Sequence, residues 1–270
     1  MKTVPGQPVI LITGASAGIG AAVARRFAQA GYHTILAARR FDRLTALAQE
    51  IRAQGGQATP IAADLSRLED IQRLAAAALE SAGQIDVLFN NAGFGRLDWL
   101  DALDPVDDVQ GQIELDLLGL IWLTQAVVPH MIERRSGHII NMVSLAGWVA
   151  PPTYSIYSAA KFGVRGFTEA LRRELIVYGI RVSGIYPGAV DTEFSARARI
   201  RRKTGVTTPA RMRLTADEVA RSVLRLAQRP RRTVILPGYM RWVILLNTLS
   251  PALVDWIIRK RFVERERGGE

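Results

Sequence analysis

A glycine-rich segment directly after a short apolar run constrains the fold of this chain more than any other feature. The run ends at Thr13, and the next seven residues read Gly14-Ala15-Ser16-Ala17-Gly18-Ile19-Gly20. Helical spacing starts at Gly18, so the segment is predicted to join a strand to a helix. Glycines let the backbone approach a pyrophosphate, and a helix N-terminus supplies N–H donors to it. Although glycines also make ordinary tight turns, this context favours nucleotide binding by Gly14, Gly18, Ile19 and Gly20.

Short apolar runs alternate with longer helical patterns along the rest of the chain. The predicted strands are Val9–Thr13, Thr34–Ala38, Ala58–Ala63, Val87–Asn90, His138–Val143, Arg181–Tyr186 and Thr233–Leu236. The predicted helices are Gly18–Ala30, Arg43–Gln54, Leu68–Ala82, Val106–Glu133, Tyr157–Tyr178 and Ala216–Gln228. This alternation predicts an α/β fold, a doubly wound parallel sheet of about seven strands with helices on both faces.

The end of the second predicted strand indicates which dinucleotide would bind. In dinucleotide-binding folds, an acidic residue about 20 positions beyond the loop binds the ribose 2′-hydroxyl, whereas a nearby arginine accommodates a 2′-phosphate. This strand ends in Ala37-Ala38-Arg39-Arg40 and has no acidic residue. We therefore expect Arg39, beside Arg40 and helped by Ser16, to bind the phosphate, so that NADP(H) is preferred over NAD(H). The alternative is that both arginines are solvated surface charges.

Tyr157 and Lys161 form a candidate catalytic pair. They lie four residues apart at the start of a predicted helix and therefore share one face of it. A neighbouring ammonium favours the phenolate and brings a phenol toward the range useful in acid–base catalysis. Ser144 follows an apolar strand, where parallel α/β sheets bind ligands, and we expect its hydroxyl to bind a substrate oxygen. The alternatives are a core tyrosine, a lysine that reaches solvent and a turn-forming serine.

Together these motifs resemble the short-chain dehydrogenase/reductase family, in its single-domain branch. The resemblance runs from about residue 8 to about residue 238. Five segments carry it, each of them a cofactor-binding or catalytic motif of the family. In chain order they are Thr13–Gly20, Asp64-Leu65, Asn90-Asn91-Ala92-Gly93, the set of Ser144, Tyr157 and Lys161, and Pro187-Gly188-Ala189-Val190-Asp191-Thr192.

The resemblance implies a Rossmann-type fold and an enzyme that transfers hydride between a nicotinamide cofactor and a carbonyl or alcohol. Tyr157 would exchange a proton with the substrate oxygen, Lys161 would bind the nicotinamide ribose and lower the pKa of Tyr157, and Ser144 would orient the substrate. The further cofactor contacts that it implies are Asp64, Leu65, Asn91, Ala92, Gly93, Pro187, Gly188, Val190 and Thr192. It also implies a homodimer or homotetramer.

One position departs from the family pattern. The family usually has an asparagine that holds a water between the active-site lysine and solvent, and Asp116 stands at this position here. A carboxylate accepts the same hydrogen bonds but donates none, and its charge stabilises a protonated Lys161. We therefore count Asp116 among the catalytic residues and expect an altered pH profile rather than an inactive enzyme.

The candidate substrate pocket is apolar and aromatic, which indicates a hydrophobic ketone, aldehyde or secondary alcohol. The residues expected to line it are Phe94, Trp99, Leu145, Trp148, Pro151, Pro152, Tyr154, Phe194 and Met212. For many of them, packing in the core or at a subunit contact is the alternative.

The net charge of +10, from 35 basic and 25 acidic residues, is concentrated in residues 195–232, which hold twelve basic residues and two acidic ones. In the family this part covers the substrate. We expect a basic lid that guides an anionic substrate, an acidic carrier or an anionic lipid surface to the site; a solvated helix face is the alternative. No nucleic-acid-binding motif accompanies the charge. The three histidines lack metal-ligand spacing, and the absence of cysteine excludes disulfides and thiolate metal sites.

We expect a catalytic domain over residues 1–238 and an amphipathic extension over residues 239–270. In the extension, Ser250-Pro251 predicts a helix start, and the helix would end in Arg259-Lys260-Arg261. Three roles stay open for it: packing on another subunit, closing over a lipid-like substrate, or lying on a membrane surface. No secretory signal is visible, and no apolar run reaches the ~18–20 residues of a membrane span. We therefore expect a cytoplasmic protein with at most peripheral membrane contact.

Three functional hypotheses follow. The leading one is an NADP(H)-dependent oxidoreductase acting on a hydrophobic ketone, aldehyde or secondary alcohol. The second is a 3-oxoacyl thioester reductase of lipid metabolism, whose acidic carrier would suit a basic surface. The third, outside the enzymes, is an NADP-binding regulatory or scaffold protein with weak turnover, against which the intact Ser144, Tyr157 and Lys161 argue.

Overall fold

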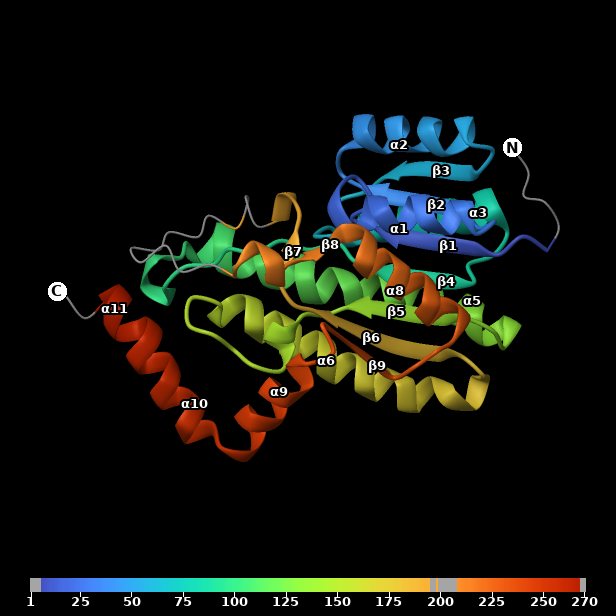
Figure 1. The fold of residues 1–270 in the computed structure, drawn as a ribbon. Helices are drawn as coiled ribbons and strands as arrows, with labels where there is room; N and C mark the ends of the chain where they lie inside the picture. The colour runs from blue at the N-terminus through green and yellow to red at the C-terminus, as the bar shows by residue number, and fades with distance from the viewer. Residues whose placement is uncertain (1–5, 195–197, 199–207, 268–270) are drawn as a thin grey trace.

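Seven parallel strands form one sheet at the centre of the protein, with helices on both of its faces (Figure 1). The structure is a computed structural model that describes residues 6–194, 198 and 208–267. The strand order is β3-β2-β1-β4-β5-β6-β9, and every neighbouring pair is parallel. This is the Rossmann-type doubly wound sheet that the alternation of strands and helices predicted.

The sheet strands are β1 (Val9–Thr13), β2 (His33–Ala38), β3 (Gln57–Ala62), β4 (Val87–Asn90), β5 (His138–Met142), β6 (Arg181–Pro187) and β9 (Thr233–Leu236). A separate parallel pair consists of β7 (Val190–Asp191) and β8 (Leu214–Thr215). The helices that pack on the sheet are α1 (Gly18–Gln29), α2 (Phe41–Ala53), α3 (Leu68–Ala82), α5 (Gly119–Arg134), α6 (Ser155–Leu175) and α8 (Ala216–Gln228). After β9 come α9 (Met240–Leu249), α10 (Pro251–Ile258) and α11 (Glu264–Arg267).

Successive residues of β1 enter two hydrophobic cores on opposite faces of the sheet. Ile10 and Ile12 pack with side chains of α1, α2 and α8. Val9 and Leu11 pack with side chains of α3, α5 and α6. Because neighbouring residues of a strand point to opposite faces, a strand covered on both faces must be apolar throughout. The unbroken apolar run before the glycine loop is therefore the mark of a central strand.

The chain builds the sheet outward from β1 in two directions, first to β2 and β3 and then, on the other side, to β4 and β5. This order creates a switch point between β1 and β4, and ligands of such sheets bind beyond the carboxyl ends of the strands there. A cleft of about 1250 Å³ lies at this edge, lined by residues that follow β1, β2, β4, β5 and β6.

All strands and helices predicted between residues 9 and 236 are present, and their ends differ by at most three residues from the prediction. The helix predicted over Val106–Glu133 spans Pro105–Arg134. Its first half differs from a regular α-helix, because two π-helical segments, Pro105–Gln110 and Glu114–Leu118, flank the single turn α4 (Gly111–Ile113). Such wide turns are frequent at functional sites, and the second of them carries Asp116.

Within the described part of the chain, Pro105–Arg134 is the one helix whose length and composition would allow it to cross a membrane. The bent pair Met240–Leu249 and Pro251–Arg267 also passes that test if it is counted as one broken span. The α5 half of the long helix places Leu123, Val127 and Met131 in the hydrophobic core. Its apolar character is therefore used in packing on the sheet.

The C-terminal helices leave the sheet after β9 and form a V, drawn in red in Figure 1. The helix predicted after Ser250-Pro251 is present, but the Ser250 side chain makes no capping hydrogen bond. The helix also does not end at Arg259–Arg261, since a π-helical turn continues it into α11. Of the basic lid predicted over residues 195–232, residues 195–197 and 199–207 lie outside the described residues.

Candidate active site

The glycine loop leaves the N-terminus of α1 open. Gly14 and Gly18 have positive φ angles of 65° and 55°, a backbone conformation that favours glycine. A Cβ atom on Gly20 would lie 2.3 Å from the carbonyl oxygen of Gly14, so the loop and the helix pack without room for a side chain. No side chain caps the first turn of α1, and no acidic residue lies in it. Its N–H groups are therefore available to an anion.

Thr13 joins this loop to the motif that follows β4. The backbone N–H groups of Asn91 and Ala92 donate to Thr13 Oγ1 at 2.8 and 3.0 Å, and Asn91 Nδ2 donates to the Thr13 carbonyl oxygen at 2.9 Å. Asn91, Ala92 and Gly93 line the cleft as predicted contacts. The role of Thr13 was not predicted, although a hydroxyl at the end of an apolar strand was a visible signal.

Arg39 and Arg40 both line the cleft, but they make different contacts. Arg40 Nη2 donates to Ser16 Oγ at 2.9 Å, and Arg40 Nη1 lies 3.5 Å from a carboxylate oxygen of Glu193. Arg39 Nη1 lies 3.8 Å from Asp64 Oδ2, and its side chain is 70% exposed. The arginine joined to Ser16 is thus Arg40, whereas we expected Ser16 to help Arg39.

The Asp64-Leu65 segment is held against α5. Ser66 donates to Asp64 Oδ1 from both its backbone N–H and its hydroxyl, at 3.1 and 2.8 Å. A Cβ atom on Gly119 would lie 2.1 Å from the Leu65 carbonyl oxygen, so only glycine permits this approach of helix and loop. Asp64 and Leu65 both line the cleft.

The segment after β6 bridges the last strand and the glycine loop. The Gly188 N–H donates to the Leu236 carbonyl oxygen at 2.7 Å. At its other end, the Thr192 methyl group would lie 3.3 Å from a Cβ atom placed on Gly18. The predicted contacts of this segment that line the cleft are Pro187, Gly188, Val190 and Thr192.

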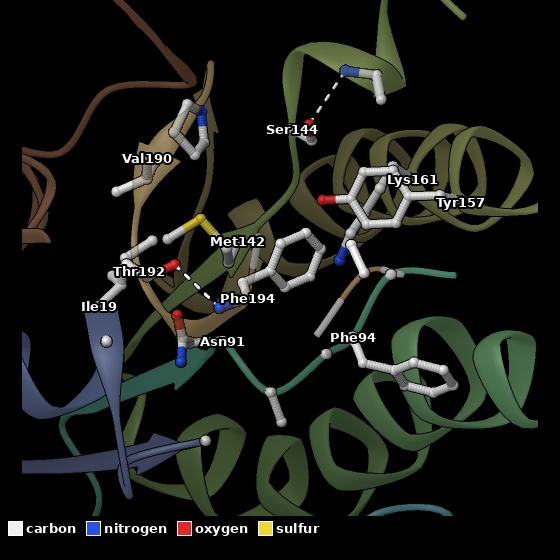
Figure 2. Close-up of a pocket in the computed structure, with 18 of the residues that line it drawn as sticks. Ile19, Asn91, Phe94, Met142, Ser144, Tyr157, Lys161, Val190, Thr192 and Phe194 are labelled. Carbon is white, nitrogen blue, oxygen red and sulfur yellow. Dashed lines mark hydrogen bonds between the residues drawn. The ribbon is translucent and has the colours of Figure 1, made fainter. Parts of the chain in front are cut away.

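Tyr157 and Lys161 project from α6 into the cleft, and Ser144 faces them from the end of β5 (Figure 2). The Lys161 Nζ atom lies 5.4 Å from the centre of the Tyr157 ring. Both side chains are buried, at 4% and 8% exposure. Ser144 Oγ accepts the Ala146 N–H at 3.1 Å, and a hydrogen bond between the Ser144 and Tyr157 side chains acts to lower the pKa of the phenol.

Asp116 lies behind Lys161 and does not line the cleft. Its Oδ2 atom is 3.3 Å from Lys161 Nζ, and its Oδ1 atom accepts the Phe94 N–H at 2.8 Å. The side chain is fully buried. A Cβ atom on Gly93 would lie 2.9 Å from Asp116 Oδ1, so the glycine of the Asn90–Gly93 motif makes room for this carboxylate. Among the predicted catalytic and cofactor-binding residues, Gly20 is the other one that does not line the cleft.

The three buried groups shift one another's pKa values. Burial raises the pKa of the Tyr157 phenol, the Lys161 charge lowers it and the Asp116 carboxylate raises it, with a net rise. Burial lowers the pKa of Lys161, but the negative groups beside it outweigh burial, so this pKa is also raised. Burial raises the pKa of Asp116 against the opposing Lys161 charge. Lys161 therefore acts in the predicted direction, yet the net shift of Tyr157 is opposite to our expectation.

The substrate side of the cleft is apolar, although not every predicted residue reaches it. Those that line it are Phe94, Leu145, Pro151, Tyr154, Phe194 and Met212, whereas Trp99, Trp148 and Pro152 do not. Trp148 packs on the Tyr186 ring. The Arg165 guanidinium carbon lies over the Trp148 ring, 3.2 Å from its centre. Trp99 stacks on Phe262 at 6.3 Å between ring centres. Both tryptophans therefore serve packing, which was the alternative interpretation.

Four further lining residues come from the C-terminal helices. Tyr239, Met240, Val243 and Ile244, at and around the start of α9, contribute to the wall of the cleft. They were not predicted as site residues. The apolar stretch around Trp242 was the available signal, but its pattern left three roles open.

A buried ladder of amides and hydroxyls supports the strand ends below the site. Asn90 Nδ2 donates to Thr124 Oγ1 and to Asn141 Oδ1, both at 2.9 Å. Asn141 Nδ2 donates to Thr168 Oγ1, also at 2.9 Å. These hydrogen bonds connect β4 and β5 to α5 and α6. They were not predicted, although an asparagine inside an apolar strand was a visible signal in the sequence. The described residues contain no group of three histidine or acidic side chains that is suited to hold a metal ion.

Known proteins are similar to this chain in both sequence and fold. The family model described as short chain dehydrogenase matches residues 8–203. A 3-oxoacyl-acyl-carrier-protein reductase of Synechocystis sp. is 38% identical over 188 residues, which cover 69% of this chain and 76% of that protein.

Two solved structures resemble the whole fold. A short-chain dehydrogenase from Sphingobium yanoikuyae in complex with NADPH has a TM-score of 0.79 and 33% identity, with 92% of this chain and 96% of that chain covered. A short-chain dehydrogenase/reductase from Burkholderia phymatum in complex with NAD has a TM-score of 0.82 and 27% identity, with 92% and 95% covered.

Proposed function

The chain belongs to the short-chain dehydrogenase/reductase family, and we propose that it is an NADP(H)-dependent oxidoreductase acting on a hydrophobic ketone, aldehyde or secondary alcohol. Family membership makes it an oxidoreductase of alcohol or keto groups. The finer proposal rests on one observation: Tyr157, Lys161 and Ser144 line a single cleft that the glycine loop and apolar side chains line as well.

The residues of the cleft fit a nicotinamide dinucleotide. The first turn of α1 has uncapped N–H groups, and a Cβ atom on Gly14 would lie 2.9 Å from the Ala92 Cα atom, so the cradle needs glycine. Gly14, Gly18 and Ile19 would hold the pyrophosphate. Contacts to the rest of the dinucleotide would come from Asp64, Leu65, Asn91, Ala92, Gly93, Lys161, Pro187, Gly188, Val190 and Thr192. When bound, the cofactor supplies or accepts the hydride.

We assign the 2′-phosphate of NADP(H) to Arg39, Arg40 and Ser16. Both arginines line the cleft at the end of β2, and Arg40 is already hydrogen-bonded to Ser16. Arginine suits a phosphate because its planar guanidinium donates several hydrogen bonds. The NADPH complex of the Sphingobium relative supports this cofactor, whereas the Burkholderia relative was solved with NAD.

In the proposed reaction Tyr157 is the acid that protonates the carbonyl oxygen of the substrate. Burial and the Asp116 charge raise its pKa, so the phenol keeps its proton at neutral pH and is ready to donate it. The Ser144 hydroxyl would donate to the same substrate oxygen. Lys161 stabilises the phenolate left behind after proton transfer. At neutral pH the phenol is therefore in the protonation state that carbonyl reduction requires.

A 3-oxoacyl thioester is the second candidate substrate class, and the Synechocystis relative favours it. NADPH oxidation by the purified protein distinguishes the candidates, with a panel of hydrophobic ketones and aldehydes and a 3-oxoacyl thioester. We expect turnover of the hydrophobic carbonyls, and exclusive turnover of the thioester would select the second class.

The homodimer or homotetramer and the cytoplasmic location stay predictions.

Replacing Tyr157 by phenylalanine tests the proposed acid directly. The ring is kept and only the hydroxyl is lost, so we expect kcat to fall by about 10²- to 10⁴-fold, the usual contribution of a positioned acid. NADPH binding, measured by fluorescence titration, should change little. Tyr154→Phe, which alters a neighbouring ring of the same cleft, is the matched control. Retained activity in the Tyr157 variant would remove the core of the proposal.

A further inference from the structure

The C-terminal V, residues 239–267, exposes an unusual amount of apolar surface. Its arms are α9 and the helical segment Pro251–Arg267, which meet at a bend of 110°, and the vertex between them points away from the sheet (Figure 1). Six large apolar side chains on the arms and the vertex are 42–75% exposed: Trp242, Leu245, Leu246, Leu249, Leu253 and Trp256. A concentration of exposed large apolar side chains of this kind indicates a site of interaction with a protein or a membrane.

The V is a fixed part of the molecule at both ends. At its start, Ile244 is buried and contributes to the wall of the cleft. At its end, Phe262 stacks on Trp99 at 6.3 Å, and Arg267 forms an ion pair with Asp101 at 2.5 Å. The exposed side chains therefore belong to helices that are already in contact with the rest of the protein.

Exposed basic residues flank the apolar side chains. The V contains six basic and three acidic residues. Arg241 lies in the first turn of α9, and Arg259, Lys260, Arg261 and Arg265 follow α10, all of them exposed. Among the described residues, no acidic side chain lies within ion-pair distance of Arg241, Arg261 or Arg265. A positive border around exposed tryptophan and leucine is the pattern of helices that lie in the headgroup region of an anionic bilayer.

We propose that the C-terminal V docks the enzyme on a phospholipid surface with anionic headgroups. The vertex, with Leu249 at 75% exposure, would enter the interface, and the arginines would contact the headgroups. A second copy of the chain suits this surface less well, because two such V-shaped elements in a symmetric contact would bring like charges together. The proposal concerns binding only and does not depend on the proposed reaction.

Vesicle flotation with the full-length protein tests the proposal. Phosphatidylcholine vesicles are compared with vesicles that also contain phosphatidylglycerol. We expect the protein to float with the anionic vesicles and to be released as salt is raised. The triple variant Trp242→Ala, Leu249→Ser, Trp256→Ala should lower the partition coefficient at least tenfold. None of these three residues lines the cleft, so the triple variant should keep the proposed carbonyl-reductase activity in solution.

The matched control is the pair Ile176→Ser and Val177→Ser. Both side chains are 65% exposed, and they directly follow α6 in the chain. The C-terminal end of α6 lies on the other side of the molecule from the V (Figure 1). Flotation of this control should equal that of the parent protein, and circular dichroism establishes that both variants are folded. Absence of flotation with anionic vesicles overturns the proposal, as does equal flotation of parent and triple variant. Conversion of an oligomer to a monomer by the triple variant, without vesicle binding by the parent, would assign the surface to a second copy.

Discussion

At the scale of single residues, the most consequential contact is the buried pair of Asp116 and Lys161. Two charges taken out of water need each other, because either one alone in this position would be strongly destabilising. Asp116 Oδ2 lies 3.3 Å from Lys161 Nζ, on the side of the lysine that faces away from the cleft. The Tyr157 phenol lies on the side of the cleft. We therefore propose that Asp116 acts on the reaction through Lys161 and Tyr157, without lining the cleft itself.

Replacing Asp116 by asparagine should move the pH dependence of activity to lower pH. The negative charge of Asp116 raises the pKa values of both Tyr157 and Lys161, so its removal lowers both. Alcohol oxidation needs the deprotonated phenol and rises with pH, and its rise should therefore begin at lower pH in the variant. The measurement is kcat against pH in both directions. Glu169→Gln is the control, because this acid is half-exposed and lies on α6, the helix that carries Tyr157 and Lys161. Identical curves for the parent and Asp116→Asn would show that the Asp116 carboxylate has no effect on the pH dependence.

The two arginines after β2 should determine the choice between NADPH and NADH. If Arg40 binds the 2′-phosphate, Arg40→Ala loses a charge-assisted hydrogen bond, and we expect kcat/KM for NADPH to fall by about tenfold or more while that for NADH changes little. Arg39→Ala should act in the same direction. Arg43 is the matched control, because it also pairs with Glu193 but does not line the cleft. Similar kcat/KM values for both cofactors in the parent protein would argue against the assignment.

At the scale of elements, the cleft depends on the packing of α8 and α1 on one face of the sheet. α8 packs against α1, the helix that follows the glycine loop, and an ion pair between Arg26 and Asp217 joins the two helices at 2.5 Å. α8 begins with a complete capping box. Thr215 Oγ1 accepts the Glu218 N–H at 3.2 Å, and the Glu218 carboxylate accepts the Thr215 N–H at 2.7 Å.

Thr215→Ala should lower the free energy of unfolding by about 1 kcal/mol, the usual value of a lost N-cap side chain. Urea unfolding followed by circular dichroism measures the difference. Ser222→Ala, in the same helix, removes a hydroxyl that only donates to the Glu218 carbonyl oxygen and should cost less. A Thr215 variant as stable as the parent would show that tertiary contacts alone hold this end of α8.

At the scale of the whole molecule, burial of β5 between two helical layers should make stability fall in acid. His138 of β5 is 5% exposed, and its Nε2 atom lies 2.8 Å from Ser183 Oγ. Burial, with the nearby Arg181 charge, lowers the pKa of His138 to about 4, from an ordinary value of 6.5. The unfolded chain therefore binds a proton on this residue at a pH where the folded protein does not.

The predicted consequence is a loss of stability as the pH falls from 6.5 toward 4. By proton linkage, the titration of His138 should lower the free energy of unfolding by about 2–3 kcal/mol at pH 4.5 relative to pH 7. In His138→Gln this part of the pH dependence should disappear, since glutamine does not titrate. Urea unfolding of both proteins at the two pH values provides the measurement. The same decrease in both proteins would assign the acid sensitivity to other groups.

Local patterns in the sequence determined most of the fold. The apolar run before the glycine loop, the helical spacing after it and the repeated alternation predicted every strand and helix of the sheet layers to within three residues. They also predicted which strand ends carry polar motifs, and nearly all of those residues line one cleft. This succeeded because periodicity, glycine conformations and strand-end motifs depend on neighbours in the chain, and because parallel strands bring their carboxyl ends to one edge.

Only the tertiary structure decided which distant side chains meet. Ser16 bonds to Arg40 rather than assisting Arg39, Trp148 packs on Tyr186, and α9 enters the wall of the cleft. Each of these depends on side-chain directions and on segments far apart in the chain, which no local pattern specifies. The same holds for Tyr157: the sequence determined that a lysine stands beside it, but the net rise of its pKa comes from burial and from Asp116, and these exist only once the chain has folded.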